Sequence, residues 1–89
     1  MHEASLIANL LRQIVAIMQQ QGPGRVVGVT VKLGALCHIS PEHLRAHFVY
    51  GARGTIAEGA RLTLESGHDP DDPHAQDVVL DYLEVEDLS

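Results

Sequence analysis

The chain has 89 residues, a hydrophobic fraction of 45% and a formal net charge of −6 at pH 7, which together indicate one small folded domain rather than a disordered segment. This acidic balance disfavours nucleic acid and anionic membranes as partners, and the single Cys37 excludes both an internal disulfide and a cysteine-based zinc cage. Because no apolar run reaches the length of a membrane span and no secretion signal is recognisable, we expect a cytoplasmic domain.

Residues 4–21 predict an amphipathic helix, because apolar side chains recur there at steps of three and four residues. The recurring apolar residues are Leu6, Ile7, Leu10, Leu11, Ile14, Val15, Ile17 and Met18. The Gly-Pro-Gly sequence at 22–24 ends this helix. Residues 25–33 alternate in hydrophobicity and predict a strand. The face of this strand that we expect to be buried carries Val27, Val29, Val31 and Leu33.

A second helix is predicted to begin after Ser40, because this hydroxyl residue is followed by a proline and an acidic residue suited to the first turn. We expect the helix to end near Tyr50, with Gly51 just beyond its end. Residues 55–58 fit a capping box and predict one tight turn.

Two more strands are predicted from alternating residues, at 61–65 and at 78–85. The residues that we expect to face the core are Leu62, Leu64, Leu83 and Val85. Residues 66–76 between these strands are polar and contain two prolines, which predicts a loop or hinge. The order helix, strand, helix, strand, strand predicts a small α/β domain with a three-stranded sheet and both helices packed on one face.

The first three residues, Met1-His2-Glu3, are the part of the chain that packing explains least. The α-amine, the backbone nitrogen of His2 and its imidazole can close around one cation as fused chelate rings, and Glu3 adds a carboxylate oxygen or another backbone nitrogen. Nitrogen-rich planar donor sets suit Ni(II) or Cu(II) better than Mg(II) or Ca(II). This site requires that Met1 is retained, which a bulky second residue favours.

Two other pairs of residues are weaker candidates for a metal site or a catalytic site. His43 and His47 stand four apart on the second helix, but Leu44 occupies the position where a zinc protease needs glutamate, so we interpret them as a solvated helix face. Cys37 and His38 are adjacent, and neighbouring residues of a strand point to opposite faces, which favours an idle thiol over a nucleophile–base pair.

The loop at 66–76 contains His68 and His74 among several aspartates. Histidine in such a loop is ordinarily a solvated polar residue. A flexible loop that carries histidine is also what a further ligand of the N-terminal site would require, and loops often carry function.

Several of these segments together resemble the HypA (HybF) family of nickel metallochaperones, which mature nickel–iron hydrogenases and, in some bacteria, urease. The matching segments are Met1-His2-Glu3, Val29-x-Val31-x-Leu33-Gly34-Ala35-Leu36, Pro41-Glu42-x-Leu44 and Gly54-Thr55-Ile56-Ala57-Glu58-Gly59-Ala60-x-Leu62. The resemblance covers residues 1–66 and then the last strand, and the combination of motifs is specific although each alone is weak.

The resemblance implies that the chain binds Ni(II) through the Met1 amine, the backbone nitrogen and side chain of His2, and Glu3. Some family members use a further histidine before the final strand, for which His74 is the nearest equivalent. The implied activity is metal delivery rather than catalysis, with a HypB-type GTPase and the hydrogenase large subunit as partners. The alternatives are an adaptor for the maturation machinery that binds no metal, and a thiol enzyme that uses Cys37.

The chain departs from the family because it lacks the zinc domain that members build from two Cys-x-x-Cys pairs. Residues 66–76 stand in place of that domain, so we expect residues 1–89 to form a nickel-binding domain without structural zinc. A loop of about ten residues closes such a gap at modest entropic cost. The sequence leaves open a natural short form or an engineered deletion, and a monomer or a homodimer that exchanges its last strand.

Overall fold

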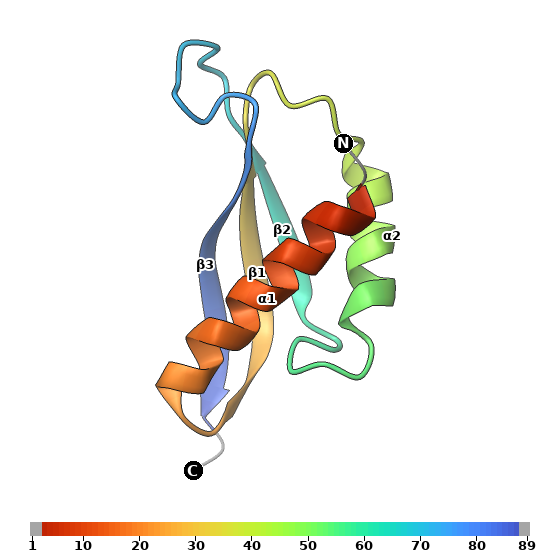
Figure 1. Ribbon diagram of the computed structural model, residues 1–89, viewed down its shortest axis with the longest axis vertical. Helices are drawn as coiled ribbons and strands as arrows, with labels where there is room; N and C mark the ends of the chain where they lie inside the picture. The colour runs from red at the N-terminus through yellow and green to blue at the C-terminus, as the bar shows by residue number, and fades with distance from the viewer. Residues whose placement is uncertain (1–2, 88–89) are drawn as a thin grey trace.

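The computed structural model describes residues 3–87, with side chains from residue 4 onward. The elements in chain order are helix α1 (Glu3–Gln21), strand β1 (Gly24–Leu33), helix α2 (Pro41–Ala52), strand β2 (Arg61–Ser66) and strand β3 (Val78–Asp87) (Figure 1). No helix among the described residues is long and apolar enough to cross a membrane.

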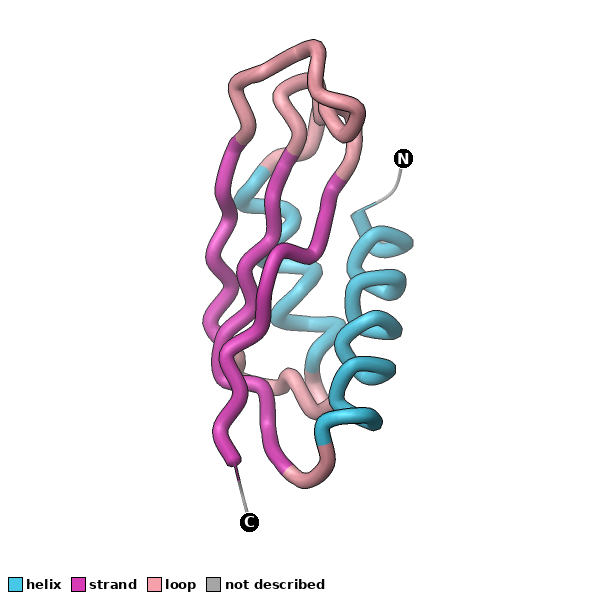
Figure 2. Tube along the Cα trace, turned by 90° about the vertical axis from the view of Figure 1, so that its left-hand side faces the viewer, coloured by secondary structure: helices cyan, strands magenta, loops and turns pink. Residues whose placement is uncertain are grey.

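The three strands form one mixed sheet in the order β2-β1-β3. The central strand β1 runs parallel to β2 and antiparallel to β3. Both helices lie against the same face of the sheet and leave the other face open (Figure 2). The predicted architecture, a small α/β domain with two helices on one face of a three-stranded sheet, is therefore confirmed.

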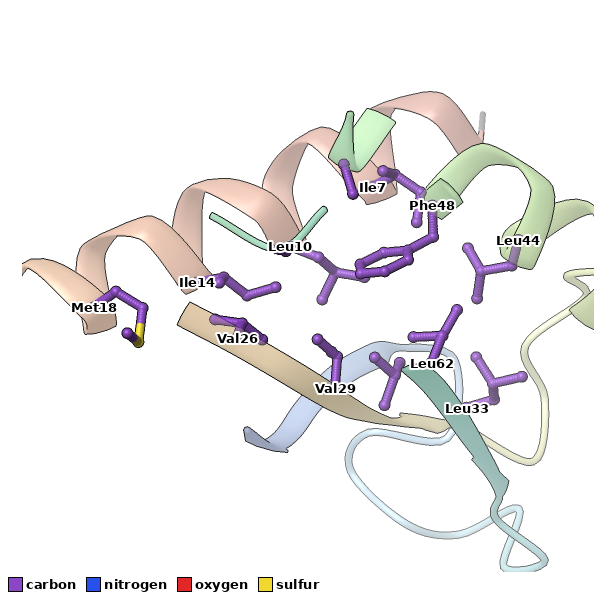
Figure 3. Close-up of a cluster of buried hydrophobic side chains, with 13 residues drawn as sticks. Ile7, Leu10, Ile14, Met18, Val26, Val29, Leu33, Leu44, Phe48 and Leu62 are labelled. Atoms are coloured by element: carbon purple, nitrogen blue, oxygen red, sulfur yellow. The ribbon is translucent and has the colours of Figure 1, made fainter. Parts of the chain in front are cut away.

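The core lies between this sheet and the two helices and is almost entirely aliphatic (Figure 3). From α1 the buried side chains are Ile7, Leu10, Ile14 and Met18, at the predicted helical spacing. From the other elements they include Val26, Val29, Val31, Leu33, Leu44, Phe48 and Leu62. Each fully buried large side chain contributes about 1.5–3 kcal/mol relative to exposure.

One prediction for β1 is wrong: Val26, not Val27, enters the core. Val26 is 1% exposed, whereas Val27 is only partly buried. The pairing with β3 passes from Val26–Val85 directly to Gly28–Glu84, so Val27 is the extra residue of a β-bulge. A bulge shifts the alternation of side chains by one residue, and two adjacent valines conceal that shift in the sequence.

Helix α2 begins as predicted but ends later. The side chain of Ser40 accepts a hydrogen bond from the backbone N–H of His43 at 3.4 Å, as an N-cap should. Gly51 lies inside the helix rather than beyond it. A β-carbon at Gly51 would lie 3.0 Å from Ile7 Cγ2 of α1, so this glycine allows the two helices to approach closely.

In β3, Leu83 packs against the core as expected, and so do Val78 and Leu80. Val85 pairs with Val26, which places it on the same face of the sheet, but it remains 43% exposed. A second irregularity in the pairing leaves Asp81 as an extra residue between Leu80 and Tyr82.

Candidate metal site

The predicted N-terminal donors, residues 1–3, adjoin the start of helix α1. Met1 and His2 lie outside the described residues, and Glu3 is the first residue of α1. One turn later, Ile7 is buried, and it faces Gly51 of α2. The first turn of α1 is therefore fixed in place by packing against the second helix, and the residues that precede it are attached to a rigid support.

His74 lies in the loop between β2 and β3, and its hydrogen bonds within the described part of the chain are made inside that loop. Its ring nitrogen Nδ1 lies 3.0 Å from Asp77 Oδ2. Its backbone N–H donates to Asp72 Oδ1 at 2.7 Å. The side chain of His74 is 70% exposed. To bind a metal through Nδ1, His74 must release Asp77, whereas Nε2 can bind while Asp77 holds the ring.

The segment between β2 and β3 is a loop, one of the two forms predicted for residues 66–76, and it is tied to the segment that follows β1. Gly34 N–H donates to the carbonyl of Asp77 at 2.9 Å, and Leu36 N–H donates to the carbonyl of Ala75 at 2.7 Å. Ala75 itself is 4% exposed. The loop is therefore held by backbone hydrogen bonds and one buried methyl group.

Sequence reasoning missed both anchors of the loop. Ala75 is an apolar residue in a strongly polar segment, and that contrast was the available signal. Gly34 directly follows the predicted strand, where a glycine is typical of a turn. It does begin a turn, since its carbonyl accepts a hydrogen bond from Cys37 N–H at 3.0 Å. In addition, a β-carbon at Gly34 would overlap the carbonyl group of Ala75, which the sequence does not indicate.

The tied loop borders an open cleft of about 570 Å³ at the end of the sheet, beside Lys32 and Asp81. The cleft brings His68 and His74 together with Asp72. Among the described residues, however, there is no group of three or more His, Cys, Asp or Glu side chains that could hold a metal ion.

Cys37 lies in the connection between β1 and α2 and is partly buried. Burial raises the pKa of its thiol above the ordinary value, the negative charge of Asp77 adds to this rise, and a hydrogen bond with the backbone of Ile39 opposes it. A raised pKa leaves less thiolate at neutral pH, so the environment of Cys37 is unsuited to nucleophilic chemistry.

Comparison with known proteins relates this domain to one family. The family model described as "Hydrogenase/urease nickel incorporation, metallochaperone, hypA" matches residues 1–68. The hydrogenase maturation factor HypA of Methylocella silvestris is 45% identical over 65 residues, which cover 73% of this chain and 58% of that protein. HypA of Chlorobaculum tepidum is 35% identical over 65 residues, with the same coverage. The chain thus spans somewhat more than half the length of these relatives.

A solved structure shares the fold. The solution structure of the Ni metallochaperone HypA from Helicobacter pylori matches with a TM-score of 0.70, and the match covers 100% of this chain and 99% of that chain. The sequence identity is 14%, so this likeness shows the fold alone.

Proposed function

Because the chain belongs to the HypA family, we propose that it is a nickel carrier that binds Ni(II) at its N-terminus and delivers it during the maturation of nickel–iron hydrogenase or urease. The observation that carries this proposal is the family match, which starts at residue 1 and therefore includes Met1-His2-Glu3. Nickel is the cargo of this protein rather than a resident cofactor.

The chemistry of the donors supports the same assignment. The Met1 amine, the backbone nitrogen of His2 and its imidazole provide three nitrogens in adjacent chelate rings, and Glu3 completes the set. Such a site selects Ni(II) or Cu(II) over the harder divalent cations. Its donors lie at the chain start and at the first residue of a helix that is packed through Ile7, so the metal can be released while the core stays folded.

The domain transfers nickel without catalysing a reaction, acts in the cytoplasm, and works with a HypB-type GTPase and the hydrogenase large subunit. Residues 66–76 replace the zinc domain, so no structural zinc is required. His74 is proposed as an additional ligand that joins the N-terminal donors when the ion is bound.

The alternative is an adaptor that binds the maturation machinery but no metal. Calorimetric titration of Ni(II) into the wild type and into His2→Ala separates the two functions. If the protein is a nickel carrier, it binds Ni(II) tightly and His2→Ala weakens this binding at least about 100-fold, because the loss of a mere outer-shell partner of a metal ligand already costs about 10–100-fold. His38→Ala is the matched control, because His38 is an exposed histidine that lies in the connection before α2.

A second variant tests the geometry of the chain start without removing a side chain. One extra residue before Met1 moves the α-amine away from His2 and leaves the fold untouched. The carrier predicts that this addition weakens Ni(II) binding about as much as His2→Ala does. Equal binding by the wild type, the extended chain and His2→Ala would refute the N-terminal site and favour the adaptor.

A further inference from the structure

Helix α2 carries a second pair of metal donors. We propose that His43 and His47 form a divalent-metal site of their own, in which two imidazoles on one face of the helix chelate a single Ni(II) or Cu(II) ion. Imidazole nitrogen suits the late first-row divalent metals. Both residues are exposed, so an ion can reach the pair from solvent without any movement of the core.

The spacing that the chelate requires is fixed by the fold. Both histidines lie inside α2, and the Ser40 cap makes the helix regular from its first turn, with Leu44 N–H bonded to the Ser40 carbonyl at 3.0 Å. Residues four apart on a helix have β-carbons about 5–6 Å apart and face the same way. Leu44 and Phe48, each the next residue after one of the histidines, are fully buried and hold this helix in one orientation.

The two rings are free to bind. Within residues 3–87, neither ring makes a hydrogen bond or an ion pair, in contrast to His74, whose ring is paired with Asp77. The basic residue of α2, Arg45, donates instead to the carbonyl of Leu62 in β2, on another side of the helix. Glu42 in the first turn offsets the positive end of the helix dipole.

One histidine of the pair, His47, lies on the α1 side of α2. His47 precedes Gly51 by one turn of α2, and Gly51 packs against Ile7 and Leu11 of α1. Figure 1 shows that the two helices begin at the same end of the molecule. His47 therefore lies on the side of α2 that is turned toward the first turn of α1.

The experiment titrates NiCl₂ into the full chain in a background of His2→Gln, which disables the N-terminal site. If His43 and His47 form a site, His2→Gln still binds one Ni(II) ion. Adding His43→Gln and His47→Gln gives a triple variant, which should bind Ni(II) at least about tenfold more weakly than His2→Gln. The reason is that the second imidazole of a chelate acts at a high effective concentration. Ni(II) should raise the thermal midpoint of His2→Gln more than that of the triple variant.

A spacing control keeps the number of histidines constant. In the same background, His47→Gln with Val49→His places the two histidines six residues apart on different faces; Val49 is 60% exposed, so the change is tolerated. This variant should bind as weakly as the triple variant. The proposed His43–His47 site is refuted if the triple variant or the spacing control binds Ni(II) as tightly as His2→Gln does. A separate comparison tests the N-terminal site. If the double variant His43→Gln/His47→Gln binds Ni(II) equally well whether or not His2→Gln is also present, the N-terminal site does not bind the ion.

Discussion

Replacing Gly34 by alanine tests whether the loop at residues 66–76 is a bound part of the fold. A β-carbon at position 34 would overlap the carbonyl group of Ala75, and it would also approach the carbonyl of His74 too closely. These are backbone atoms, so no side chain can rotate away to relieve the overlap. The loop must move, and the two hydrogen bonds that Gly34 and Leu36 donate to it are strained or lost.

The expected loss follows from these contacts. Overpacking costs about 1–3 kcal/mol, and each intramolecular hydrogen bond contributes about 0.5–1.5 kcal/mol. We therefore expect Gly34→Ala to lower the free energy of unfolding by about 2–6 kcal/mol. In a domain of this size each kcal/mol lowers the melting temperature by about 4–8 °C, so the melting temperature should fall by at least about 8 °C.

Urea denaturation followed by circular dichroism measures this loss, and Gly67→Ala is the matched control. Gly67 lies at the other end of the same loop, but a β-carbon there would lie 3.4 Å from the nearest atom, the carbonyl oxygen of Leu33, which is an ordinary contact. The control should change stability by less than about 0.5 kcal/mol. If both variants unfold at the same urea concentration, the loop is not tied as described.

The sequence predicts the fold well where one face of an element is buried. The spacing from Ile7 to Met18 gives helix α1, and the hydroxyl-proline-acid order at Ser40 gives the start of α2, because both signals depend on local geometry alone. The bulge at Val27 was not predictable in this way, because it depends on how β3 pairs with β1.

Two glycines have a role in packing that the sequence does not show. A glycine after an apolar run is typical of a helix end, and a glycine after a strand is typical of a turn. Gly51 lies inside its helix and Gly34 does begin a turn, but both glycines also make room for a neighbouring segment: Gly51 for Ile7 of α1 and Gly34 for Ala75 of the loop. Close approach between segments that are distant in sequence leaves no local signal. For the same reason the sequence can name donors such as His2 and His74 but cannot place one relative to another.

Two further predictions address the core and the thiol. Phe48 is 1% exposed, so Phe48→Ala should cost about 3–5 kcal/mol in urea denaturation, while Val49→Ala on the exposed face of the same helix should change stability by less than about 0.5 kcal/mol; equal losses would contradict the packing. Cys37 should react with iodoacetamide at pH 7.5 more slowly in the folded chain than in the chain unfolded in urea, because burial and the charge of Asp77 raise the pKa of the thiol and so lower its thiolate fraction. The rate in the folded chain should rise as pH increases, through a midpoint above that of the unfolded chain. Asp77→Asn removes the neighbouring negative charge, lowers the pKa of Cys37 and should speed the reaction. If the folded chain reacts as fast as the unfolded chain, the thiol of Cys37 is activated, and this result would support the alternative of a thiol enzyme.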